Sequence, residues 1–153
     1  MREINFNFKK QLDRIIGGEL HSYCYQCGAC VGDCPAARYS ERFNPRRILL
    51  QVILGQAEEL LAENSVLWEC TNCYNCYERC PQDVRPVEVI VALKNICAKR
   101  KTNPDKVRNL VQSVVKGGRT VLMTTAAQRM REELGLEPLA AARVEELQKI
   151  LKD

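Results

Sequence analysis

The sequence is dominated by a run of cysteines that occurs twice with the same spacing. Residues 24–35 read CYQCGACVGDCP and residues 70–81 read CTNCYNCYERCP. Both follow the pattern C-x2-C-x2-C-x3-C-P, and each cysteine of the second run follows its counterpart by 46 residues. Eight of the nine cysteines in this 153-residue chain belong to the two runs. The repeat predicts a pair of pseudo-symmetric halves, each built around a group of thiols.

This spacing suits a cubane iron-sulfur cluster. Thiolates at i, i+3 and i+6 on a turning loop can converge on three corners of one [4Fe-4S] core, whereas an extended strand would spread them too far apart. In bacterial two-cluster ferredoxins the fourth cysteine of such a run ligates the other cluster. The proline that follows favours an extended conformation for the residue before it, so we expect the fourth cysteine to turn toward the neighbouring site.

Crossed ligation predicts two ligand sets for two [4Fe-4S] clusters. The first cluster is predicted to take Cys24, Cys27, Cys30 and Cys80. The second is predicted to take Cys70, Cys73, Cys76 and Cys34. Zinc ribbons and a disulfide framework are the alternatives. Zinc sites normally close with two C-x-x-C pairs and have no use for a third cysteine at the same step. Disulfides are disfavoured because nothing marks the chain as secreted.

Composition argues against several other functions. Hydrophobic residues at 46% and charged residues at 27% are typical of a globular protein rather than a disordered one. The start of the chain has no apolar signal core and the longest aliphatic stretch, residues 48–54, is too short for a membrane span. We therefore expect a cytoplasmic protein without direct membrane insertion. The formal charge of +4 is cancelled by eight thiolates and two +2 cores, so it does not indicate nucleic-acid binding.

Helical patterns account for most of the remaining chain, and no alternating strand pattern competes. Caps such as Asn44 with Pro45, Ser65 and Pro86 mark where helices or turns begin. The expected segments are residues 6–16, 45–54, 57–62, 66–69, 86–100, 104–116, 125–134 and, as a helix or tail, 138–151. The link between the two cysteine runs is therefore mostly helical, which excludes the small β-rich bacterial ferredoxin and favours the α-helical ferredoxin arrangement.

The expected fold class is all-α. Residues 1–101 are predicted to form an alpha-helical ferredoxin-like domain that wraps two [4Fe-4S] clusters. Residues 102–153 contain no cluster ligand, so we expect additional C-terminal helices that act as a scaffold or dock a partner.

Other residues near the runs are expected to have structural roles. Cys97 falls on the apolar stripe of the 86–100 segment and is predicted to be buried rather than catalytic. His21 is expected at the surface or beside a cluster, because the four-cysteine sets are already complete. Aromatic residues flank the cysteines and are expected to pack against the clusters in the ordinary way; they are Tyr23, Tyr25, Trp68, Tyr74 and Tyr77.

The sequence between about residues 20 and 100 resembles the C subunit of heterodisulfide reductase. The likeness rests on the two cysteine runs, on AARY at residues 36–39, on NPRR at 44–47, on Trp68-Glu69 before the second run, and on VRP at 84–86. Iron-sulfur subunits of succinate dehydrogenase, glycerol-3-phosphate dehydrogenase and glycolate oxidase share the cysteine spacing alone. The intervening residues and the small size favour the reductase family.

The resemblance implies an electron-transfer role. In that family, the C subunit passes electrons from a flavin-containing A subunit to the B subunit, whose Cys-Cys-Gly motifs hold the noncubane clusters that reduce the disulfide of coenzymes M and B. This chain has neither adjacent cysteines nor a G-x-G-x-x-G fingerprint, so no catalytic residue is expected in it. Alternatives are a subunit of a sulfur-oxidising heterodisulfide-reductase-like complex, a freestanding dicluster ferredoxin, and a cluster-dependent redox sensor, for which no convincing helix-turn-helix is found.

Overall fold

A computed structural model describes residues 4–121, 123–140 and 142–150. Helices and turns are the only regular elements in these residues, and no strand occurs among them. The expectation of an all-α fold is confirmed. The chain divides into two compact units, residues 1–104 and residues 105–153, which are described separately.

The first unit repeats its own elements. Its α-helices and 3-10 turns (η) are, in order, α1 (Phe6–Ile16), η1 (Leu20–Tyr23), α2 (Ala29–Gly32), α3 (Pro35–Tyr39), α4 (Pro45–Ile53), η2 (Glu58–Leu61), η3 (Val66–Glu69), α5 (Asn75–Glu78) and α6 (Pro86–Lys99). The bounds of η3 and α5 are those of η1 and α2 shifted by 46 residues. The offset seen in the cysteines therefore extends to the backbone around them.

Local sequence explains where the longer helices begin and end. The side chain of Asn5 accepts hydrogen bonds from the backbone N–H groups of Asn7 and Phe8, and Gly17 ends α1 in the left-handed conformation at φ 82°. Asn44 caps α4 in the same way, 3.0 Å from the nitrogen of Arg47. The expected helices at 6–16, 45–54 and 86–100 are confirmed, whereas the segment at 57–62 forms only the 3-10 turn η2.

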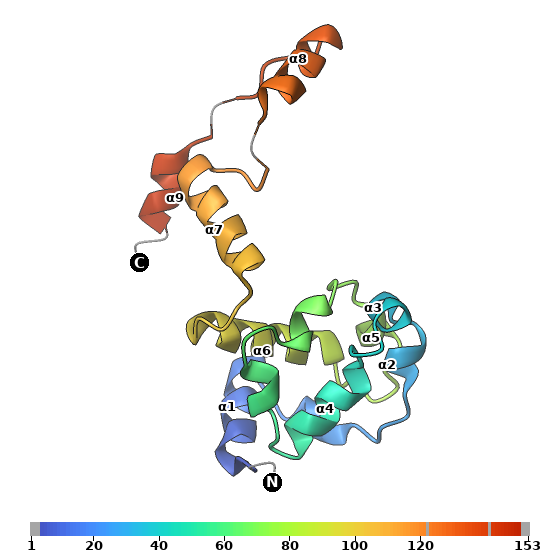
Figure 1. The fold of residues 1–153 in the computed structure, drawn as a ribbon. Helices are drawn as coiled ribbons and strands as arrows, with labels where there is room; N and C mark the ends of the chain where they lie inside the picture. The colour runs from blue at the N-terminus through green and yellow to red at the C-terminus, as the bar shows by residue number, and fades with distance from the viewer. Residues whose placement is uncertain (1–3, 122, 141, 151–153) are drawn as a thin grey trace. The chain divides into compact units, whose positions relative to one another are not determined.

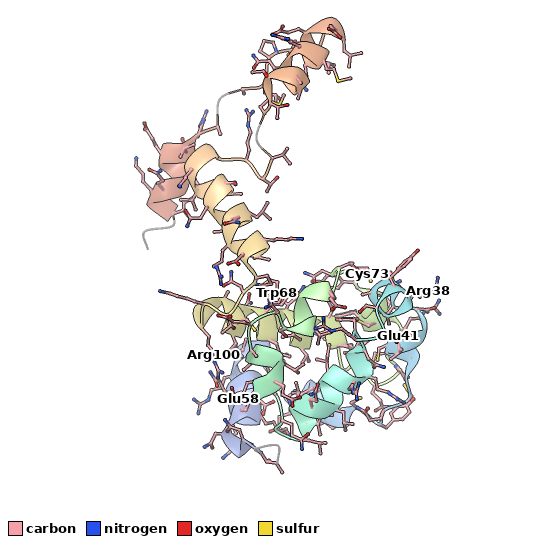
Figure 2. The ribbon with its side chains drawn as sticks, in the orientation of Figure 1. Arg38, Glu41, Glu58, Trp68, Cys73 and Arg100 are labelled. Carbon is pink, nitrogen blue, oxygen red and sulfur yellow. The ribbon has the colours of Figure 1, made fainter. Side chains whose placement is uncertain are left out.

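The long helix α6 is the centre of the first unit. It packs against α1, α4, α5, η2 and η3, and its Val87 and Leu93 are fully buried. Figure 1 shows α1 toward one end of α6, and α2, α3 and α5, which surround the cysteines, toward the other. At the end near α1, Arg100 lies 2.7 Å from Glu58 and ties η2 to the helix (Figure 2). Cys34 belongs to the same apolar core, so the cysteine runs rest directly on it.

The burial of four residues can be compared with what the sequence predicts. Cys97 is fully buried, as predicted, and its thiol points to the carbonyl oxygen of Leu60 at 3.7 Å. His21 is also fully buried, so a surface position is wrong. Tyr23 and Tyr25 are 64% and 59% exposed, which means that ordinary packing does not describe these two rings.

The second unit consists of α7 (Asp105–Gly117), α8 (Thr125–Glu133) and α9 (Val144–Ile150), with α7 packed against α9. The helices expected at 104–116 and 125–134 are confirmed. Of the segment expected at 138–151, residues 138–140, 142 and 143 are not helical and α9 begins at Val144, while residues 141 and 151 lie outside the described residues. Arg119 and Arg131 donate hydrogen bonds to the carbonyls of Ala140 and Glu137, at the start of that segment.

Candidate iron-sulfur centres

Two small cavities in the first unit are each bordered by four cysteines. One has about 270 Å³ of empty space, part of it open to solvent. Its cysteines are Cys24, Cys27, Cys30 and Cys80. The other has about 310 Å³. Its cysteines are Cys34, Cys70, Cys73 and Cys76. The structure groups the eight thiols in the same two sets of four cysteines that the spacing predicts.

The backbone of the two runs follows nearly the same path. Cys24 and Cys70 are extended, at φ −69° and −66°, directly after η1 and η3. Gly28 (φ 90°) and Tyr74 (φ 64°) then occupy equivalent left-handed positions before the short helices that carry Cys30 and Cys76.

The fourth cysteine of the first run shows how ligation can cross between the halves. Cys34 is extended, at φ −81° and ψ 116°, before Pro35, as the cysteine-proline pair predicts. The short helices α2 and α5 contact one another, and the side-chain amide of Asn75 donates a hydrogen bond to the carbonyl of Asp33 at 3.1 Å. Each run is therefore held beside the cavity of the other.

The third cysteines of the two runs both have raised pKa values. Burial, and next the negative charge of Cys76, raises the pKa of Cys30 to about 12. Burial, and next Cys70 and Cys34, raises the pKa of Cys76 to about 11. Both groups are thiols at neutral pH unless a cationic core compensates their charge. Cys30 lies on α2 and Cys76 on α5, and these helices contact one another, so the two cavities adjoin.

Polar groups also reach sulfur atoms of the first cavity. The side-chain amide of Gln26 donates to Sγ of Cys24 at 3.3 Å, and the backbone N–H of Val84 donates to Sγ of Cys80 at 3.2 Å. The pKa of Cys27 is lowered, mainly by the backbone N–H of Ala29. Hydrogen bonds of this kind stabilise thiolates and are one means by which a protein sets the potential of a cluster.

The arrangement of the donors suits a cubane better than a single ion. Among the residues that the structure describes, no three His, Cys, Asp or Glu side chains come close enough together to hold one metal ion. A zinc ion needs sulfur ligands at about 2.3 Å. A core of four irons holds its thiolates farther apart, and the four thiols that border each cavity can supply them.

Sequence reasoning missed several residues around the cavities. Arg46 borders the first cavity beside Cys27. Lys94, on the mostly apolar helix α6, turns its ammonium group to the loop of the second run. A lysine within an otherwise apolar stripe was the available signal in the sequence.

Comparison with known proteins agrees with this geometry. Residues 21–84 match the family described as the 4Fe-4S dicluster domain. Together with the two cavities, this match defines the class: the chain is a dicluster iron-sulfur protein that holds two [4Fe-4S] clusters.

Relatives narrow the class further. The chain is 34% identical to the iron-sulfur C subunit of the CoB–CoM heterodisulfide reductase of Methanopyrus kandleri, over 84% of this chain and 69% of the relative. It is 35% identical to the corresponding C 2 subunit of Methanocaldococcus jannaschii, over 88% and 74%. It is 33% identical to a protein of Archaeoglobus profundus described as like the C subunit of heterodisulfide reductase, over 90% and 74%. The chain belongs to the family of heterodisulfide reductase C subunits.

Family and site together define what the chain does. Each bound cluster takes up and releases one electron, so the chain is an iron-sulfur electron-transfer protein. Relatives named as subunits of a reductase imply that it is one member of a multi-subunit complex. Within the described residues, no helix is both long enough and apolar enough to cross a membrane.

Proposed function

We propose that this chain relays single electrons inside a heterodisulfide reductase complex, from a flavin-containing A subunit to a catalytic B subunit with Cys-Cys-Gly motifs. The pair of adjoining four-cysteine cavities carries this proposal, because an electron can pass between two such centres without leaving the chain. Relatives named for CoB–CoM heterodisulfide reduction support the assignment of the complex. Free thiols must stay reduced to be ligands, which favours the cytoplasm as the location.

The proposed ligands are the two cysteine sets that border the cavities. Cys24, Cys27, Cys30 and Cys80 hold the first cluster. Cys34, Cys70, Cys73 and Cys76 hold the second cluster. In each set one cysteine is exposed, Cys27 in the first and Cys73 in the second, and the two occupy equivalent positions in the repeat. Figure 2 shows Cys73 at the edge of the first unit. We expect redox groups of the larger subunits to approach the clusters most closely at these two exposed cysteines.

The second unit is proposed to dock the chain onto the larger subunits. Its described helices contain no buried residue, and α7 leaves Leu110 and Val111 about half exposed, at 46% and 51%. Apolar side chains on an amphipathic helix gain stability when a partner covers them.

The first experiment is anaerobic iron and sulfide analysis with electron paramagnetic resonance of the reduced protein. We expect about eight irons per chain and two interacting S = 1/2 signals. Stoichiometric zinc without a visible charge-transfer band would reject the cluster assignment.

Crossed ligation is tested with the two fourth cysteines. Cys34→Ser is expected to perturb the signal that Cys73→Ser also perturbs, and Cys80→Ser the signal that Cys27→Ser perturbs. The opposite pairing would show that each run holds its own cluster.

Docking is tested by co-expression with the larger subunits. The full chain is expected to co-purify with a flavin-containing subunit, while a chain ending at Pro104 keeps its irons and loses this association. A full chain that purifies alone would favour the freestanding ferredoxin.

A further inference from the structure

The side chain of Lys94 connects α6 to the second cysteine run. Its ammonium group donates hydrogen bonds to the carbonyl oxygen of Cys70 at 2.9 Å and to the side-chain oxygen of Asn72 at 3.1 Å. It also lies 5.7 Å from the centre of the Trp68 ring. The residue is half-buried. A flexible side chain is thereby fixed at one place, because two oxygen acceptors and an aromatic face surround its charge.

The charge of Lys94 lies close to Cys70, which borders the second cavity. Burial lowers the pKa of Lys94, and the negative charge of Cys70 opposes this shift. A half-buried charge is screened less by water and salt than an exposed one.

The first half of the repeat has no counterpart of this charge. The position 46 residues before Lys94 is Ile48, whose side chain is 2% exposed and belongs to the apolar core. The cation that borders the first cavity, Arg46, comes from a different position of the repeat and is exposed. Sulfur atoms accept hydrogen bonds in both cavities, from Gln26 and Val84 in the first and from the backbone N–H of Val87 to Cys76 in the second. The two halves differ in the half-buried cation, since Lys94 of the second corresponds to the apolar Ile48 of the first.

We propose that Lys94 is a positioning residue whose fixed positive charge selectively raises the reduction potential of the second cluster. The proposal rests on the ligand sets given under Proposed function. A [4Fe-4S] cluster with four thiolates carries a charge of −2 when its core is +2, and reduction by one electron makes this charge −3. A nearby cation stabilises the more negative form, so the reduced cluster is favoured.

The test is a redox titration of the full chain with both clusters in place, followed by electron paramagnetic resonance. Lys94→Gln removes the charge and keeps a hydrogen-bond donor. Lys94→Arg keeps the charge. Lys99→Gln is the matched control, because it removes the same charge from an exposed position on the same helix. Cys73→Ser and Cys27→Ser identify which signal belongs to which cluster.

Lys94→Gln is expected to shift the midpoint of the second cluster to a more negative potential and to leave that of the first almost unchanged. Lys94→Arg is expected to stay close to the parent protein, and Lys99→Gln to shift neither cluster. An unmoved second midpoint, an equal shift of both, or a shift in Lys94→Arg as large as in Lys94→Gln would each overturn the proposal.

A second variant keeps the proposal testable if Lys94→Gln fails to hold its second cluster. Asn72→Gly removes one acceptor, suits the positive φ of that residue (52°) and leaves Lys94 in the chain but less firmly held. A smaller shift of the same sign in the second cluster supports the proposal, and no shift contradicts it. Failure of the ligand sets is distinguishable, because Cys34→Ser would then perturb the same signal as Cys27→Ser whatever Lys94 does.

Discussion

Arg79 and Asp33 form an ion pair between equivalent positions of the repeat. The guanidinium nitrogen lies 2.7 Å from the carboxylate. Each residue immediately precedes the fourth cysteine of its run, and the two positions are 46 apart in the sequence. The two halves are thus linked by charge at the same point where the proposed ligation crosses between them. Equivalent positions of the repeat therefore carry opposite charges, Asp33 in the first half and Arg79 in the second.

Charge reversal at this pair should test how much it stabilises the clusters. Both side chains are more than 40% exposed, so Arg79→Ala is expected to cost less than about 1 kcal/mol, a factor of about five in an equilibrium. Arg79→Asp places like charges together and should cost more. Asp33→Arg combined with Arg79→Asp should recover most of the loss.

The rate at which a chelator removes iron from the folded protein measures this effect. Arg119→Ala is a control far along the sequence in the second unit. A double variant as labile as Arg79→Asp would show that the ion pair does not link the halves.

Gly28 should be more sensitive to substitution than the other glycine of its run. Its φ of 90° is unfavourable for a residue with a Cβ, although no atom lies within 4 Å of where the Cβ would be. Gly28→Ala is therefore expected to cost about 1–2 kcal/mol through backbone strain alone and to make the first cluster more labile than the second. Iron release resolved by the two paramagnetic signals measures this.

Gly32→Ala provides the matched comparison. Gly32 is helical, has no positive φ and also has open space around it, so alanine should be neutral or slightly stabilising there. Equal lability of both variants would mean that the strain at Gly28 does not matter.

Tyr74 shows why this conformation could be predicted at one half of the repeat only. Glycine at position 28 indicates a left-handed residue, but a tyrosine at the equivalent position does not, and Tyr74 nevertheless adopts φ 64°. Helix caps such as Asn44 and the cysteine groups could be predicted because their signals are local. The burial of His21 and the contact of Lys94 with the Cys70 loop depend on contacts between distant segments, which no local pattern encodes.

Replacement of Cys97 should leave both clusters intact. The thiol is fully buried and borders neither cavity, and burial, as the first cause, raises its pKa. Cys97→Ala is expected to retain about eight irons per chain and to lose about 1 kcal/mol of stability from the missing sulfur atom. Cys30→Ala, at another buried cysteine, should lose the first cluster. Iron content below that of the parent in Cys97→Ala would contradict the assignment of the ninth cysteine.

His21 should make the stability of the protein depend on pH below neutrality. Burial lowers its pKa from 6.5, the nearby carboxylate of Asp13 raises it by a smaller amount, and Lys9 and Glu19 act in opposite directions. The folded protein therefore binds the proton less readily than the unfolded chain. The stabilisation from the neutral ring is fully present above about pH 6.5 and decreases as pH falls from there toward the folded pKa.

His21→Asn should remove this dependence, since asparagine does not titrate. Anaerobic urea unfolding, followed by circular dichroism at pH 7.5 and pH 6.0, measures the loss between the two conditions in each protein. Asp13→Asn is the informative second variant, because without the carboxylate the protonated ring is even less favourable and the loss should continue to lower pH. If the parent and His21→Asn lose equal stability between the two conditions, the pH dependence arises elsewhere in the molecule.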